Sequence, residues 1–149
     1  MQIRILKINT CPSRSGKSQL TYQLGCNEQS EVYLRIHGNS GTGFFNDEWI
    51  PVKRIQAQLS SCGNQFTSFA LNALFKGKSM NTPFFILAVL FKEGLVITST
   101  SNRRCYQLGD FDAFFKRIEP LIQSETALTE PTKKKLKPKD EAVLDTLLR

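Results

Sequence analysis

The chain has 149 residues, of which 40% are hydrophobic and eleven are phenylalanine, so it can bury a core as one domain or as two small halves. It contains no run of about 18 apolar residues, so no transmembrane helix and no membrane partner are expected. The first residues alternate like a strand and lack the plan of a signal peptide, which predicts a cytoplasmic protein.

The charge of the chain favours a polyanionic partner. Twenty Lys and Arg residues against thirteen Asp and Glu residues give a net charge of +7. Residues 1–123 hold fourteen basic and eight acidic side chains, so the excess is not confined to the Lys-rich end of the chain. Nucleic acid is the partner that a basic body of this kind favours.

The first half of the chain predicts an antiparallel sheet followed by a helix. Three segments alternate between apolar and polar side chains, as half-buried strands do. A Gly-rich loop leads to a short fourth strand at 43–46, and Asn46 or Asp47 is the expected N-cap of a helix. This helix has Pro51 in its first turn and ends before Cys62. The three alternating segments are residues 2–9, 18–26 and 31–37.

The second half is expected to resemble the first, but its elements are less clearly marked. Residues 66–75 fit a strand or a two-turn helix, because periodicity does not separate the two. Residues 84–91 are rich in Phe, Ile and Val and precede the turn-forming sequence Lys92-Glu93-Gly94. We therefore expect residues 84–91 to form a hairpin with a strand at 95–100.

The chain then turns again and ends in a helix and a polar tail. A turn at 102–104 brings residues 105–108 back along the strand before them, and Asp110 is the expected cap of an amphipathic helix. Beyond Ser124 the sequence is rich in Lys and Pro, which predicts a solvated linker. The last residues, 140–149, fit either disorder or a short amphipathic helix that docks on a protein partner.

The two halves also match each other in sequence. At an offset of 63 residues, Asp47 aligns with Asp110, and the Lys-Arg-Ile triplet starting at Lys53 aligns with the triplet starting at Lys116. The match is either a duplication of one half-sized unit or chance similarity between elements of like composition. The expected fold class is α+β, with antiparallel β-sheets each followed by a helix, as two β4α units. The units span residues 1–62 and 63–123, and residues 124–149 form the tail.

No catalytic or metal-binding set emerges from the sequence. The four cysteines are 15, 36 and 43 residues apart and form no C-x-x-C pair, and His37 is the one histidine, so a zinc site is not expected. A catalytic Ser or Cys would also depend on His37 as its base. Two Gly-Lys-Ser sequences, at 16–18 and 77–79, lack the first glycine of a phosphate-binding loop. We therefore expect a protein that is not an enzyme and that uses no cofactor and no metal.

What remains is a set of basic and aromatic side chains on strands and loops. Cations follow the phosphates of a single strand, and exposed rings stack on unpaired bases at about 1–3 kcal/mol each. The outward face of the strand at 31–37 is expected to make many of these contacts, and the Gly-Lys-Ser loops to add cations. The predicted nucleic-acid-binding residues are Arg4, Lys7, Arg14, Lys17, Tyr33, Arg35, His37, Lys76, Lys78, Arg103, Arg104 and Tyr106.

The segment YLRIHGNSGTGFFNDEWIPVKRIQAQL resembles the single-stranded-DNA-binding domain of the positive cofactor four and Whirly families. In that domain a third strand leads through a Gly-containing loop into a short apolar strand and a capped helix with an early Trp. The corresponding features here are Tyr33–Ile36, Gly38–Gly43, Phe44-Phe45 and Asp47-Glu48-Trp49. The resemblance covers about residues 1–60. It implies single-stranded DNA as the ligand and a pairing of two such units, within the chain or as a homodimer.

Two other interpretations fit the sequence. Residues 51–108 can form three helices, at 51–61, 66–75 and 82–92, followed by a hairpin wing at 95–108. That order is typical of winged-helix regulators that bind duplex DNA, but the third helix would lack Arg, Asn and Gln to read base edges. The other alternative is a protein-interaction or inhibitor module with an apolar surface in the second half.

Overall fold

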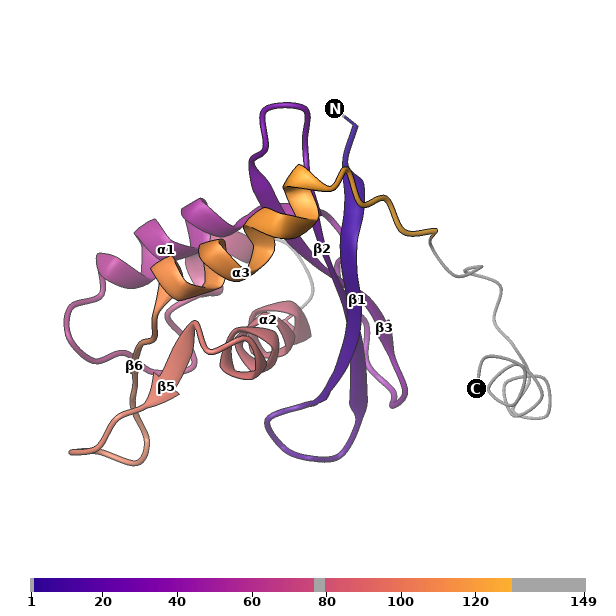
Figure 1. Ribbon diagram of the computed structural model, residues 1–149. Coiled ribbons are helices and arrows are strands. Elements are labelled where there is room, and N and C mark those ends of the chain that lie inside the picture. The colour runs from indigo at the N-terminus through magenta and orange to yellow at the C-terminus, as the bar shows by residue number, and fades with distance from the viewer. Residues whose placement is uncertain (1, 77–79, 130–149) are drawn as a thin grey trace.

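The structure is a computed structural model in which residues 2–76 and 80–129 are described. A four-stranded antiparallel sheet with the order β1-β2-β3-β4 has all three α-helices on one side, and a two-stranded hairpin joins the second helix to the third (Figure 1). The strands are β1 (Arg4–Pro12), β2 (Gln19–Cys26), β3 (Val32–Asn39), β4 (Ile50–Pro51), β5 (Val96–Thr98) and β6 (Tyr106–Leu108). The helices are α1 (Val52–Ser60), the short 3-10 helix η1 (Asn72–Phe75), α2 (Asn81–Lys92) and α3 (Phe111–Gln123).

The predicted α+β class is confirmed, and the first half has the expected order of four strands and a helix. As the alternation in β2 predicts, its apolar side chains Leu20, Tyr22 and Leu24 are buried under the helices. Each of the two sheets is followed in the chain by a helix, α1 after β4 and α3 after β6. No helix in the described part of the chain combines the length and the apolar character needed to cross a membrane.

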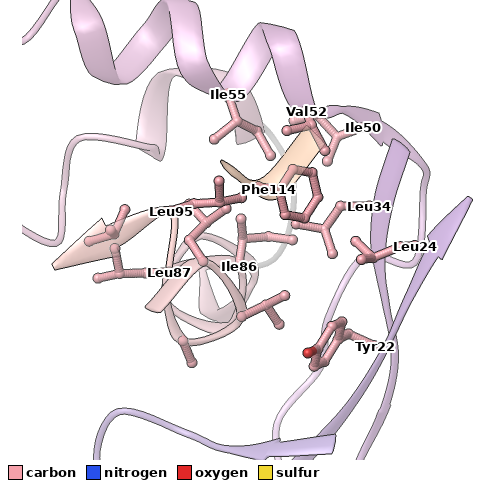
Figure 2. Packing of buried hydrophobic residues seen from close by; sticks show 14 of the residues in the cluster. Tyr22, Leu24, Leu34, Ile50, Val52, Ile55, Ile86, Leu87, Leu95 and Phe114 are labelled. Atoms are coloured by element: carbon pink, nitrogen blue, oxygen red, sulfur yellow. The ribbon is translucent and has the colours of Figure 1, made fainter. Parts of the chain in front are cut away.

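One hydrophobic cluster joins the sheet to the helices (Figure 2). Leu24 and Leu34 of the sheet meet Ile55 of α1, Ile86 of α2 and Phe114 of α3, and each of these side chains is at most 1% exposed. Burying one such side chain stabilises a fold by roughly 1.5–3 kcal/mol. The residues of the two predicted units therefore contribute to the same core.

The fourth strand and the first helix begin later in the chain than predicted. Residues 43–46 form no strand, and Ile50–Pro51 pairs with β3 instead. Helix α1 has Pro51 as its N-cap and no side-chain cap, so neither Asn46 nor Asp47 caps it. The reason is that proline disfavours the helical conformation of the residue before it, which keeps the chain extended up to this point. Trp49 consequently precedes the helix.

The apolar segment predicted as a strand at 84–91 is helix α2, which is a correction. Seven of its twelve residues are buried, so its sequence shows neither an amphipathic stripe nor an alternation. Gly94, with φ of +78°, ends this helix rather than turning a hairpin. The amide of Leu95 donates to the carbonyl of Leu90 at 2.8 Å, the bond that closes a helix end of this type. Helix ends and tight turns both favour glycine, so Gly94 gives the same sequence signal for either structure.

The last hairpin and helix of the second half agree with the prediction. Residues 105–108 pair back along β5, and the carboxylate of Asp110 accepts a hydrogen bond from the amide of Ala113 at 2.9 Å. Residues 66–75 form neither a strand nor an α-helix: Phe66 makes an isolated bridge with Tyr106, and a 3-10 turn follows. The second half thus repeats the plan of the first in its final strands and helix, not in a four-stranded sheet.

Candidate nucleic-acid interface

The outer face of the sheet, away from the helices, is largely closed. Tyr33 is 7% exposed, and its hydroxyl oxygen accepts from Asn27 Nδ2 at 3.4 Å. Trp49 lies against the sheet at Gly25, where a Cβ atom would come within 3.1 Å of the indole ring. The prediction that Tyr33 offers its ring to a base is therefore wrong. Alternation identifies the side of a strand on which a residue lies, but it does not reveal what covers that side.

Arg35 is engaged within this outer face. Its Nε donates to Oε1 of Gln23 at 2.9 Å, and its guanidinium lies 4.4 Å from the centre of the Trp49 ring. Gln23 is fully buried, and its Nε2 has no hydrogen-bond partner among the described residues. His37, further along β3, is half-buried. Arg35 therefore holds Trp49 on the sheet, and the pair covers the surface that was predicted to bind bases.

Arg4 and Lys7 face the helices, so their predicted place on the nucleic-acid-binding face is wrong. A bulge in β1 pairs Arg4 with Cys26 and Lys7 with Leu24, which brings both onto the buried side of the sheet. Lys7 Nζ forms an ion pair with Glu93 at 2.9 Å. The Arg4 guanidinium donates at 2.7 Å to the carbonyls of Ile122 and Thr126, and more distantly to that of Leu121. Both side chains attach helices to β1.

A buried polar cluster surrounds the end of α2. The carboxylate of Glu93 accepts hydrogen bonds from Lys7 and from the hydroxyl of Tyr22, and the backbone carbonyl of Glu93 accepts from Arg117 at 2.7 Å. Burial, reinforced by the hydrogen bond to Glu93, raises the pKa of Tyr22 well above its ordinary value. The partners within this cluster satisfy one another, which fixes the end of α2 on the sheet.

Five of the predicted residues come from the turn between β1 and β2 and from the β5–β6 hairpin, and Arg14 of the turn lies near Tyr106 of the hairpin. The turn between β1 and β2 bends toward the helix side of the sheet (Figure 1), and there the guanidinium of Arg14 lies 4.0 Å from the ring centre of Phe91 in α2. The ring centre of Tyr106, in β6, is 5.7 Å away. We use the name tip cluster for the contacting residues Arg14, Phe91 and Tyr106 together with the cations that are near them in the sequence: Lys17, Lys92, Arg103 and Arg104.

The tip cluster is strongly basic. Residues 10–27 and 94–109, which contain the two turns, have four basic side chains and no acidic one. These four and Lys92 are all exposed. Burial raises the pKa of Cys11 in β1 to about 11, and the charge of Lys92 opposes this shift, which shows that Lys92 lies near β1. A polyanion is the ligand that such a surface attracts.

Local hydrogen bonds give both turns a defined shape. Between β1 and β2, the amide of Ser13 donates to the carbonyl of Ser18 at 2.9 Å, and the hydroxyl of Ser13 accepts from the amide of Ser18 at 3.3 Å. Between β5 and β6, the side-chain oxygen of Asn102 accepts from the amide of Arg104 at 3.0 Å. Turns that are already ordered lose less conformational entropy when a ligand binds.

Lys76 is exposed after η1 and has no contact with the tip cluster that the structure records, and Lys78 lies outside the described residues. Phe91 and Lys92 were not among the predicted residues, because their segment was expected to form a hairpin. The signal that identifies them is Gly94 as the end of a helix, with Lys92 in the last turn, where a cation favours the helix dipole.

No group of three or more His, Cys, Asp or Glu side chains is placed to hold a metal ion in the described part of the chain. A comparison with protein-family models, with curated proteins and with solved structures finds no match. The resemblance to positive cofactor four and Whirly domains therefore stays a prediction. The geometry of the tip cluster is the basis on which a function is proposed.

Proposed function

We propose that this protein binds single-stranded nucleic acid, with single-stranded DNA as the favoured ligand, through the tip cluster. The observation that supports this is Arg14 lying over the rings of Phe91 and Tyr106, among four further exposed cations. Cations next to partly exposed rings are the combination that an unpaired strand requires, because the cations neutralise phosphates and flat groups stack on bases. The proposed role is binding without catalysis and without a cofactor.

The proposal keeps the ligand expected from the sequence and moves the contact surface. The outer face of the sheet is covered by Trp49 and Arg35, whereas the tip cluster is exposed and lacks acidic neighbours in its two turns. A cytoplasmic location and a pairing of two chains stay predictions. A protein partner for residues 140–149 is also a prediction, and it lies outside the described residues.

A winged-helix function has less support. The order of helical segments and a final hairpin does match that alternative along the chain. However, α2, which would be the recognition helix, has Ile86, Val89 and Leu90 in the core at 0–1% exposure (Figure 2 labels Ile86). A recognition helix must present a continuous polar face to the major groove. Burial on this scale leaves α2 without such a face.

The first prediction concerns the salt dependence of binding. We expect the protein to bind oligo(dT) with an affinity that falls as salt rises, since each contacted phosphate of a single strand contributes about −0.7 to the slope of log K against log salt. Lys17→Ala and Arg104→Ala should each make this slope shallower by about 0.7, because each removes one cation from the tip cluster. Fluorescence anisotropy at several salt concentrations measures the slope.

The matched control is Lys53→Ala, which removes an exposed lysine from α1, beside Phe115 and Glu119 of α3. It should leave the slope unchanged. The proposal is wrong if the wild-type protein prefers duplex DNA or binds oligo(dT) without salt dependence. It is also wrong if Lys53→Ala weakens binding as much as the two tip-cluster variants do.

A second candidate function is supported by an exposed apolar patch at the start of α2. Phe44, Phe69 and Met80 are 89%, 64% and 84% exposed. They gather there because Phe69 packs edge-on against Phe84 at 5.9 Å and the side chain of Asn81 donates to the carbonyl of Phe44 at 3.0 Å. Such patches are typical of protein–protein contacts. A protein-interaction module would need no polyanion, so the oligo(dT) titration separates the two candidates.

A further inference from the structure

We infer that Arg14 is a stacking surface for an unpaired nucleobase and not merely a cation for a phosphate. This inference depends on the proposed function and deepens it, because it names the part of the ligand that Arg14 contacts. It starts from the position of one planar cation above two aromatic rings, those of Phe91 and Tyr106.

The guanidinium is already in contact with one ring and close to a second. At 4.0 Å from the ring centre, its carbon is in van der Waals contact with Phe91, and the Tyr106 ring at 5.7 Å is within the range of cation–π attraction. Arg14 is nevertheless exposed, so part of its side chain stays open to solvent. Among the described residues, no acidic side chain lies within ion-pair distance of Arg14.

We expect a base to stack on the part of the guanidinium that stays open to solvent. Guanidinium planes stack on nucleobases as well as on aromatic side chains, because both surfaces are flat and polarisable. A base placed there would complete a stack of ring, guanidinium and base. The rings and the hydrogen-bonded turn around Ser13 already restrict Arg14, so less side-chain entropy is lost on binding than for a free arginine.

This contact would also set the preference for single strands. In a duplex both faces of each base are covered by neighbouring bases, so a stacking surface on the protein finds no free face. The other exposed cations of the tip cluster, namely Lys17, Lys92, Arg103 and Arg104, would follow the phosphates on either side of the stacked base. Arg14 then determines which strands bind, and the other cations determine how the affinity depends on salt.

The test compares two ligands and one conservative substitution. The ligands are oligo(dT) and a strand of the same length made of abasic deoxyribose spacers, which has the same phosphates but no bases. We expect the wild-type protein to prefer oligo(dT) by about 5- to 150-fold, the range that one stacked base provides. Arg14→Lys keeps the positive charge but removes the planar guanidinium group. It should lose most of this preference while keeping the wild-type salt slope and the affinity for the abasic strand.

Two further variants test whether the preference for oligo(dT) over the abasic strand comes from stacking. Phe91→Leu removes the ring beneath the guanidinium and keeps an apolar side chain, so it should reduce the base preference in the same direction. Lys17→Ala should weaken binding to both strands equally. Unfolding midpoints close to that of the wild type show that the variants are folded.

The outcomes separate the inference from the function on which it depends. If Arg14→Lys keeps the wild-type preference for oligo(dT), or if the wild-type protein binds both strands equally, the stacking role is refuted and the proposed function remains. If the wild-type protein binds neither strand in a salt-dependent manner, the proposed function fails and the inference fails with it.

Discussion

The pKa values of single residues in this protein are shifted most around the polar cluster at the end of α2. Tyr22 is fully buried with its hydroxyl on Glu93, and Cys11 is buried in the neighbouring strand. Burial is the main cause that raises the pKa of both groups, to about 11 for Cys11 and to well above the ordinary value for Tyr22. Both groups are therefore protonated in the folded state over a wider pH range than in the unfolded chain.

We predict that stability falls as the pH rises above about 9. The unfolded chain releases the Cys11 proton near its ordinary pKa of 9.0, whereas the folded protein keeps it up to about 11. The unfolded state then binds fewer protons, so alkaline pH favours unfolding, by at most about 1.4 kcal/mol per pH unit for one group. Urea unfolding at pH 8, 9 and 10 measures this slope.

The control for this prediction is Cys11→Ala, which removes one of the two groups. Its absolute stability will differ from that of the wild type, but the decline between pH 9 and 10 should be shallower. An unchanged decline in this variant, or constant stability of the wild type over the range, would contradict the explanation.

Among the elements, the β5–β6 hairpin depends on one close backbone contact at its base. The amide of Gly109 donates to the carbonyl of Leu95 at 2.8 Å, and that of Asp110 donates to the carbonyl of Gly94 at 3.2 Å. A Cβ atom on Gly109 would lie 2.0 Å from the Gly94 oxygen. The oxygen belongs to the backbone and the backbone of residue 109 fixes the position of its Cβ atom, so no side-chain rotation can relieve the overlap.

We predict that Gly109→Ala destabilises the protein by roughly 2 kcal/mol or more, because the start of α3 must move away from Gly94. The displacement should also weaken oligo(dT) binding, since Arg103 and Arg104 lie in the same hairpin. Gly38→Ala is the matched control. Its Cβ atom would meet Thr21 at 3.5 Å, an ordinary contact, and its effect should stay within about 0.5 kcal/mol. Similar unfolding midpoints for the two variants would refute this account.

At the scale of the whole molecule, Arg4 connects the two ends of the described chain. Its guanidinium bonds the carbonyls of Ile122 and Thr126, just beyond which Leu128 pairs with Ile5 at the edge of β1. Figure 1 shows the chain after α3 crossing β1 at this place. An arginine that looks like a phosphate contact in the sequence thus holds the last helix on the first strand.

We predict that Arg4→Ala loosens this attachment without removing nucleic-acid binding. Amides of residues 121–128 should exchange with deuterium faster, because their carbonyl neighbours lose a charged donor worth roughly 1.5–3 kcal/mol. The amides of β2 and β3 should keep their protection, and the affinity for oligo(dT) should remain as in the wild type. A large loss of oligo(dT) affinity with unchanged exchange would instead support the contact predicted from the sequence.

The sequence predicted those elements whose signals are local. The alternation of β2, the cap at Asp110 and the turn at 102–104 each follow from a few neighbouring residues, and all three were predicted correctly. Helix α2 was missed because a segment buried on most sides shows no periodicity. For the candidate site, the basic residues of the two turns could be named from the sequence, but the partner of Arg14 could not.

By itself, the sequence determined the antiparallel α+β class, the basic character of the surface, and which strand and helix positions alternate. These depend on composition and on spacing along the chain. Only the tertiary structure decided that Tyr33 is buried, that Arg4 and Lys7 attach helices, and that Arg14 meets Phe91 and Tyr106. The physical reason is that burial and partnership depend on which segments pack together, and residues 77 to 122 positions away supply the partners of Arg4, Lys7 and Arg14.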